Sequence, residues 1–326
     1  MGDLSLLQKV ASSENLWKAF KECARGKRAT LGYQKFMYGA GERLAEIQSQ
    51  LLGDTYSWQG YREFIVKDPK ARVIMAAPFC DRVVHHAIHR VIEPIFEPLL
   101  SDRSYACRKG KGTSRAVLDL SEALGALGTS RFVVKLDVEN FFASISQDIL
   151  LNRMVQVLPD GSLLSLLNSL IRDSHQGSSS LGKGIPIGNL TSQLFANWIL
   201  TPADKFIERY HSRVRHFRYM DDFVILASEK KDALDCAHAT VNYIARELEL
   251  NIPFTKVMPL ASDPVPFLGY LLSHDGYKVL ARNRGRFQKH LRRLQSNGAP
   301  DSRVAQAMYS YNSWTLIPEK CKKQKG

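Results

Sequence analysis

The stretch His216–Ala227, which reads HFRYMDDFVILA, decides the fold of this chain. Two adjacent acids, Asp221 and Asp222, lie between two apolar runs, so the stretch predicts two β-strands joined by a tight turn. Neighbouring carboxylates repel each other and lose solvation in an apolar setting, so the pair predicts a compensating cation, most simply a divalent metal ion. An ordinary hairpin turn is the alternative, because aspartate tolerates turn geometry.

Composition favours a globular protein with a polyanionic partner. The chain has 326 residues, 44% of them hydrophobic, which is enough for one large fold or two to three subdomains. Its net charge of +13 favours nucleic acid, with an anionic membrane surface as the competing possibility. The N-terminus lacks an apolar signal segment and the chain lacks a long apolar run, so neither secretion nor membrane insertion is expected. Five scattered cysteines without a Cys-x-x-Cys pair indicate reduced thiols in a cytoplasmic protein.

Much of the positive charge lies in the last fifty residues. From Lys278 to Gly326 there are twelve lysines and arginines against two acids. Four of them recur at three- and four-residue steps, as one stripe of a helix would: Arg282, Arg286, Lys289 and Arg293. Such a stripe suits the phosphate backbone of a nucleic acid, although a solvated helix face is the simpler alternative.

Hydrophobic periodicity places the other elements. Residues 1–50 read as helices, residues 61–75 as a hairpin that turns at Asp68-Pro69, and residues 131–137 as a buried strand that ends on Asp137. Further helices are expected over 81–96, with a break or kink at Pro94, and over 147–157, 190–203 and 231–248, and a short strand over 267–271. His85 and His89 on the first of these helices could share a metal ion, but ordinary helix packing is favoured.

Asp137 and Asp221 are the acids placed for two-metal phosphoryl transfer. That chemistry needs carboxylates from separate strands that converge on a pair of cations. Each of these acids ends or interrupts an apolar strand, so side-by-side pairing of the strands would bring them together. Two unrelated surface acids are the alternative, which is weak because both acids lie among residues that ought to be buried.

Five motifs in order over about residues 60–295 make the chain resemble a reverse transcriptase. They are Lys70–Ile74 in the fingers, Leu136–Phe142 and Tyr219–Asp222 in the palm, Leu248–Lys256 in the following palm motif, and Phe267–Tyr270 in the primer grip. The resemblance implies an α+β right-hand polymerase whose palm is an antiparallel sheet with helices. It implies an N-terminal helical extension over 1–55, fingers over 56–130, palm over 131–272 with a fingers-like insertion at about 150–185, and a basic helical thumb over 273–326.

The resemblance also assigns roles to residues. Asp137 and Asp221 would bind two Mg²⁺ ions, with Mn²⁺ as an alternative, assisted by the Val138 carbonyl and by Asp222 as a weaker partner. Lys256 would be the general acid for departing pyrophosphate, and Phe142 the gate that excludes a ribose 2′-hydroxyl. The residues expected at the incoming deoxynucleotide are Lys67, Lys70, Arg72, Phe142, Ile187, Gly188 and Gln193. The primer grip would be Phe267, Leu268, Gly269 and Tyr270, with the basic stripe binding nucleic acid.

One departure from the usual pattern refines the family. Most reverse transcriptases have Gln-Gly-x-x-x-Ser-Pro before a palm helix, whereas this chain has Ile187 in place of the glutamine and Gln193 in place of the proline. The pair of changes resembles reverse transcriptases of diversity-generating retroelements. That resemblance implies cDNA synthesis from a template RNA with errors at adenines, and a small basic oligomeric accessory protein as partner. A retron-like or antiphage enzyme without mutagenic role and an inactive nucleic-acid-binding scaffold are the alternatives.

Overall fold

The structure is a computed structural model that describes residues 4–67, 71–127, 132–172, 182–210, 212–253, 258–259 and 264–315. Two compact units divide the chain, and each is assembled from separate segments. Unit 1 comprises Met1–Ser101, Val138–Ala203 and Tyr243–Ile252, and unit 2 comprises Asp102–Asp137, Asp204–Asn242 and Pro253–Gly326. The long helices α10 (Leu190–Tyr210) and α11 (Lys230–Leu248) each contribute to both units.

Unit 1 begins with a helical layer. Its helices are α1 (Leu6–Ala11), α2 (Ser13–Cys23), α3 (Leu31–Met37), α4 (Ala40–Leu52) and α5 (Phe79–Phe96), followed by the 3₁₀ turn η1 (Glu97–Leu99). Helix α1 starts with a capping box, in which Ser5 accepts from the Gln8 N–H and the Gln8 side chain accepts from the Ser5 N–H. Stacked and edge-on rings hold the layer together, from Phe20, Tyr33, Phe36 and Phe79.

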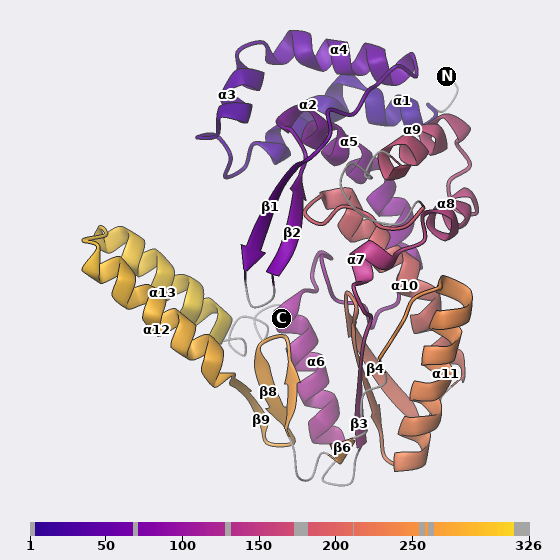
Figure 1. Cartoon of the computed structure of the whole chain (residues 1–326), viewed down its shortest axis with the longest axis vertical. Helices are drawn as coiled ribbons and strands as arrows, with labels where there is room; N and C mark the ends of the chain where they lie inside the picture. Colours follow the sequence, from indigo (N-terminus) through magenta and orange to yellow (C-terminus); the bar gives the residue numbers. More distant parts are fainter. Residues whose placement is uncertain are drawn as a thin grey trace, which may run out of the picture. The chain divides into compact units, whose positions relative to one another are not determined.

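A two-stranded hairpin and a second group of helices complete unit 1. Strand β1 (Arg62–Lys67) pairs antiparallel with β2 (Ala71–Ala76) (Figure 1). All of β1 and the first half of β2 are exposed. The helices are α7 (Phe141–Ser144), α8 (Gln147–Val155) and α9 (Gly161–Arg172). Asp160 joins the two helical groups because its carboxylate accepts from the Leu163 N–H in α9 and from the Leu7 N–H in α1, each at 3.0 Å.

The centre of unit 2 is a four-stranded antiparallel sheet in the order β4-β5-β3-β6. Its strands are β3 (Phe132–Asp137), β4 (Val214–Tyr219), β5 (Asp222–Ala227) and β6 (Met258–Pro259). Helix α6 (Thr113–Ala126) packs through buried Leu120 and Leu124 into the core that lines one face of this sheet. The same core includes Val133 of β3 and Val224 of β5.

A second sheet and two helices follow along the chain. Strands β7 (Val265–Phe267), β8 (Tyr270–Ser273) and β9 (Gly276–Val279) form a three-stranded antiparallel sheet. Its buried residues, Val265, Phe267, Tyr270 and Leu272, belong to the same core as α6 and the four-stranded sheet. Helices α12 (Ala281–Ser296) and α13 (Asp301–Thr315) lie side by side, with the Phe287 and Tyr311 rings stacked at 3.8 Å (Figure 1).

Most elements expected from the sequence are confirmed, with two differences. Helix α10 continues to Tyr210 although Pro202 lies inside it, because the turn beyond the proline is packed through buried Ala203 and Ile207. Helix α5 ends at Phe96 as predicted, with Pro94 inside it. The single strand expected over residues 267–271 is wrong: β7 ends at Phe267 and β8 begins at Tyr270, with a two-residue turn between them.

Two further features concern the hydropathy of the helices and the state of the cysteines. Within the described part of the chain, no helix is both long and apolar enough to cross a membrane. The cysteines that the structure describes, Cys23, Cys80, Cys107 and Cys236, are all free thiols.

Candidate active site

Three carboxylates converge at one end of the four-stranded sheet. Strand β3 pairs antiparallel with β5 so that Asp137 lies directly opposite Asp222, and β4 pairs with β5 so that Tyr219 also faces Asp222. Met220 and Asp221 form the two-residue turn between β4 and β5. The pairing of the two acid-bearing strands, expected from the sequence, is therefore confirmed, and the register places Asp222, rather than Asp221, across from Asp137.

The turn that carries Asp221 adopts an uncommon backbone conformation. Met220 has a φ of 55°, the left-handed region that bulky side chains rarely occupy. Two-residue hairpin loops need positive φ to match the right-handed twist of their strands, and glycine or asparagine usually supplies it. A methionine there keeps this geometry only if surrounding contacts hold it, and such strain is often found at functional sites.

Arg218 supplies one of those contacts from a fully buried position. Its Nη1 donates to the Met220 carbonyl at 3.0 Å. Its Nε and Nη2 donate to the carboxylate of Asp204 in α10 at 2.6–2.9 Å, and His216 lies 3.2 Å from the same carboxylate. Burial acts to raise the pKa of Asp204, but the Arg218 guanidinium and the His216 hydrogen bond outweigh it and hold this pKa below its ordinary value.

Asp222 faces a lysine from the neighbouring strand. Lys135 Nζ lies 3.2 Å from Asp222 Oδ2 and 3.0 Å from the carbonyl oxygen of Pro266 in β7. Burial raises the pKa of Asp222 to about 6; Lys135 opposes this shift, and the charges of Asp137 and Asp221 add to it. The three carboxylates are thus close enough to repel one another, which is the electrostatic problem that a divalent cation would relieve.

The acids supply the oxygen ligands that Mg²⁺ prefers. Asp222 Oδ1 is buried and has no hydrogen-bond partner among the described residues, while Asp137 is exposed. No three His, Cys, Asp or Glu side chains in the described ranges are arranged to hold a metal ion by themselves. Mg²⁺ is usually held by one or two carboxylates together with substrate phosphates and water, so the magnesium-binding role of these acids stays a prediction.

The residue after Asp137 and the expected ribose gate belong to unit 1. Val138 is buried, and Asn140 turns the chain with a φ of 47° into the short helix α7. The Phe142 ring lies 5.5 Å from that of buried Phe141 in an edge-on arrangement, and its carbonyl accepts from the Ile185 N–H at 2.9 Å. Phe142 is therefore a partly exposed ring on a fixed backbone.

The β1–β2 hairpin and the Ile187-Gly188 segment are in contact within unit 1. The Met75 N–H of β2 donates to the Ile187 carbonyl at 2.9 Å. Gly188 has a φ of 115°, and a Cβ there would lie 2.9 Å from Cγ2 of Ile74. Only glycine therefore fits this close approach. Gln193 follows in the first turn of α10 and is partly exposed.

The basic residues of the hairpin are exposed. Val66 opposes Arg72 and Ala71 opposes Lys67, so Lys67 and Arg72 start from opposite faces of the two-stranded sheet. Lys70 lies outside the described residues, as does Lys256. Their expected roles at the triphosphate and at pyrophosphate remain predictions.

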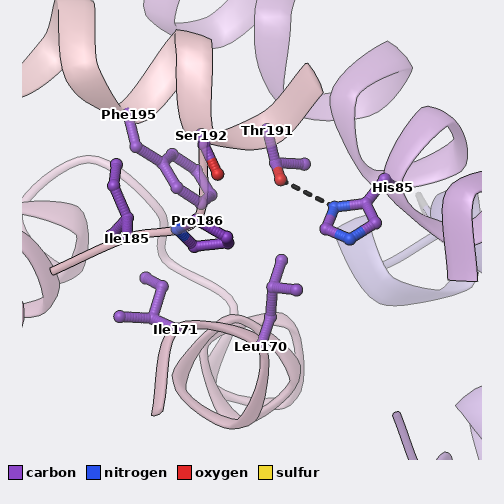
Figure 2. A pocket seen from close by; sticks show the side chains of 8 residues that line it. All are labelled: His85, Leu170, Ile171, Ile185, Pro186, Thr191, Ser192 and Phe195. Atoms are coloured by element: carbon purple, nitrogen blue, oxygen red, sulfur yellow. Dashed lines mark hydrogen bonds between the residues drawn. The ribbon is translucent and has the colours of Figure 1, made fainter. Parts of the chain in front are cut away.

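A small, largely apolar pocket lies in unit 1 between residues of α5, α9, α10 and the segment before Ile187 (Figure 2). His85 of α5 reaches Thr191 of α10 at 2.7 Å between Nδ1 and Oγ1. Burial, followed by the charges of His86 and Arg82, lowers the pKa of His85 to about 3, so the ring is neutral at physiological pH. The remaining lining residues are Leu170, Ile171, Ile185, Pro186, Ser192 and Phe195.

The expected primer grip forms a tight turn. Phe267 and Tyr270 are paired and buried, while Leu268 and Gly269 between them have φ values of 49° and 90°. Positive φ at both loop residues is the pattern of a type I′ hairpin turn. The Gly269 carbonyl accepts from the Leu280 N–H at 3.0 Å and from Asn283 Nδ2 at 3.1 Å. This turn is thus fastened to the start of α12.

The basic stripe lies on α12, as its spacing predicted. Arg282, Arg286, Lys289 and Arg293 are all exposed on this helix. Arg284 and Arg292 are exposed on the same helix, so its positive charge is broader than the four residues selected by spacing. The helix therefore presents several exposed cations that suit a polyanion.

Sequence reasoning missed the two cations around the acids, half-buried Lys135 and fully buried Arg218. Lys135 and Arg218 each interrupt an otherwise apolar strand, which was the available signal. Asp204, the partner of Arg218, carried no such signal, because its role depends on where α10 packs.

Comparison with known proteins decides the family. A family model described as reverse transcriptase (RNA-dependent DNA polymerase) matches residues 65–272, more than half of the chain. The chain belongs to the reverse transcriptase family. This family member is 24% identical to protein YkfC of Escherichia coli K12 over 267 residues, which cover 69% of this chain and 70% of YkfC. It is also 24% identical to the group II intron-encoded protein LtrA of Lactococcus lactis over 51% of this chain, but spans only 28% of LtrA.

Solved structures agree on the fold. Telomerase from Candida albicans, solved with a fragment of telomeric RNA, matches 69% of this reverse transcriptase family member and 46% of its own chain, with a TM-score of 0.50 and 12% identity. The likeness shows the fold alone. The architecture is that of a right-hand polymerase, with mixed helices and antiparallel sheet, as the sequence predicted.

Proposed function

We propose that this chain is an RNA-directed DNA polymerase that copies an RNA template into cDNA by two-metal phosphoryl transfer. The observation that carries the proposal is the convergence of Asp137, Asp221 and Asp222, one with a buried and unpartnered oxygen, in a member of the reverse transcriptase family. Three mutually repelling acids destabilise a folded protein unless cations compensate them. An inactive scaffold would gain nothing from keeping them.

The chain's own residues supply binding and orientation in this proposal. Asp137 and Asp221, with the Val138 carbonyl, would hold two Mg²⁺ ions, which when bound activate the primer 3′-hydroxyl and neutralise charge on the triphosphate. Asp222 is a weaker partner because Lys135 occupies its Oδ2. Lys67 and Arg72 bind the triphosphate through charge-assisted hydrogen bonds, and Phe142 excludes a 2′-hydroxyl. Lys70 and Lys256 keep the triphosphate and general-acid roles that the resemblance gives them.

Substitution of Asp221 by asparagine tests the site. With a pre-annealed DNA primer on an RNA template, Mg²⁺ and deoxynucleotides, we expect wild-type protein to extend the primer and Asp221→Asn to lose extension by at least about 100-fold. RNA affinity should change by less than about twofold, because the basic helix α12 is unaffected. Asp235→Asn, at an exposed acid in α11, is the matched control and should retain full activity. Undiminished synthesis by Asp221→Asn would remove Asp221 from the metal site.

We further propose that synthesis is error-prone at template adenines, for targeted diversification of a sequence. Ile187 and Gln193 support this, because they replace the glutamine and proline that most family members have before the palm helix. The Ile187 backbone is held against β2, so the substitution changes the side chain on a fixed support. Loss of a polar group at a selecting pocket loosens discrimination between bases.

The fidelity proposal has its own experiment. The cDNA made by wild type, Ile187→Gln and the apolar control Ile187→Leu is sequenced, with and without a candidate small basic accessory protein. We expect Ile187→Gln to lower misincorporation opposite adenine, and Ile187→Leu to leave it unchanged. Accurate wild-type synthesis would favour the retron-like or antiphage alternative. RNA binding without any synthesis, in Mg²⁺ or Mn²⁺ and with the accessory protein, would favour the inactive scaffold.

A further inference from the structure

Lys135 joins the candidate active site to the turn expected to grip the primer. Its Nζ donates to Asp222 Oδ2 at 3.2 Å and to the Pro266 carbonyl at 3.0 Å. Its side chain is 23% exposed and that of Asp222 is 24% exposed, so the ion pair is partly shielded from solvent. One side chain therefore contacts both the acid-bearing sheet and the neighbouring three-stranded sheet.

The position of Lys135 on β3 follows from strand alternation. Val133, Lys135 and Asp137 share one face, and their partners across the pair are Leu226, Val224 and Asp222. Val133 is fully buried in the apolar core, whereas Asp137 is exposed. Lys135 lies at the boundary between them, where its aliphatic stem can pack on the core while its ammonium reaches the acid.

The second contact of Lys135 is on an edge strand. The three-stranded sheet has the order β7-β8-β9, so β7 pairs with a strand on one side only. Val265 and Phe267 on either side of Pro266 are buried in the core, which holds the strand in place. Lys135 donates to the carbonyl between them. It thereby restrains the strand immediately before the Leu268-Gly269 turn.

We propose that Lys135 is a positioning residue that locks the primer-grip turn to the strand carrying Asp137, and so sets the primer terminus against the catalytic acids. The inference rests on the polymerase function proposed above. Placement of the primer 3′-hydroxyl matters because an error of about 1 Å in the alignment of reacting groups can slow a reaction by about 100-fold. The Lys135 ammonium, hydrogen-bonded to Asp222 in β5 and to the Pro266 carbonyl in β7, restricts such errors.

Kinetics of three variants of the full chain test this role. Lys135→Met removes the charge and the donor but keeps the aliphatic length, Lys135→Arg keeps a cationic donor, and Lys231→Met removes an exposed lysine of α11 from the same unit. Single-nucleotide extension of a pre-annealed primer is measured at varied primer–template and varied deoxynucleotide concentrations. We expect Lys135→Met to slow extension at saturating substrates by about 10- to 100-fold, with the KM for deoxynucleotide changed less than about twofold.

The other variants separate positioning from folding. We expect Lys135→Arg to recover activity to within about fivefold of wild type, because a retained cationic donor can keep both contacts of Lys135. We expect Lys231→Met to stay within about twofold of wild type, because Lys231 is an exposed lysine of α11. Extension by Lys135→Met within twofold of wild type would overturn the proposal. So would a lost rate accompanied by an equal rise in the KM for deoxynucleotide, or no recovery in Lys135→Arg.

Hydrogen exchange provides a readout independent of catalysis. Amides of residues 264–273 should exchange at least about fivefold faster in Lys135→Met than in wild type or Lys231→Met, because local opening of β7 becomes easier. Unchanged exchange in this segment would refute the lock. If wild-type protein makes no cDNA while exchange changes as expected, the polymerase function fails and the lock between the two sheets stands.

Discussion

Replacing Arg218 by methionine should destabilise the β4–β5 hairpin by about 3–5 kcal/mol at neutral pH, the usual cost of removing one partner of a buried ion pair. Arg218 and Asp204 are both fully buried. The arginine makes three hydrogen bonds to the carboxylate of Asp204 and a fourth to the Met220 carbonyl. Methionine fills much of the volume but leaves Asp204 with His216 as its remaining partner at that carboxylate among the described residues.

The pH dependence of this loss follows from the pKa of Asp204. In wild type this pKa is lowered, so the carboxylate contributes stability above about pH 3.8, its ordinary value, and loses it as pH falls through the lowered pKa. Without Arg218, burial dominates and raises the pKa of Asp204 above its unfolded value. The variant then gains relative stability as pH falls. The difference between the two proteins should therefore be largest near pH 7.5 and shrink toward pH 5.

Hydrogen exchange of the β4 and β5 amides measures this local stability without assuming two-state unfolding of a chain with two units. Arg215→Met is the matched control, because Arg215 is an exposed arginine on the same strand. Surface substitutions of this kind usually change stability by less than about 0.5 kcal/mol. A loss below about 1 kcal/mol in Arg218→Met, or a loss that is the same at pH 7.5 and pH 5, would refute the reasoning.

Two further predictions concern the fingers segment and helix α12. Gly188→Ala should lower stability by about 1–3 kcal/mol in a thermal melt, because its φ of 115° and the 2.9 Å approach to Ile74 exclude a Cβ. Gly125→Ala, at an open position in the last turn of α6, should instead leave stability unchanged or raise it by less than about 1 kcal/mol, and equal effects of the two substitutions would contradict this account. Arg286→Gln should weaken RNA binding across sequences and reduce the magnitude of the salt slope by about one. Arg213→Gln, outside α12, should leave that slope unchanged, and a slope unaffected by Arg286→Gln would argue against a phosphate contact.

Much of the fold could be predicted from local pattern. The apolar runs around Asp221 and Asp222 predicted the β4–β5 hairpin, and the buried-type strand ending at Asp137 predicted β3, because alternation and turn chemistry act over a few residues. The sequence predicted this helix only as far as residue 203, and it did not predict that α10 continues to Tyr210. Tertiary packing of the residues beyond the proline outweighs its local preference.

The candidate site divides in the same way. The presence of acids on two strands was readable, and so was the order of the family motifs. The residues that support the acids could not be read from the sequence. Lys135 contacts Pro266, which is 131 positions away, and Arg218 of β4 contacts Asp204 of α10. Such contacts depend on how helices and strands pack against one another, and the hydrophobic periodicity of one segment does not contain that information.

The sequence by itself determined that this chain carries a pair of acids in an apolar hairpin, a third acid at the end of another strand and a basic helix, because residue type and spacing fix local structure and charge. Only the tertiary structure decided that Asp222 stands opposite Asp137, that Leu268 and Gly269 form a turn, and which cations face the acids. Strand register and side-chain partners are set by packing between residues far apart in the chain, and a shift of one residue would place the opposite face toward the core.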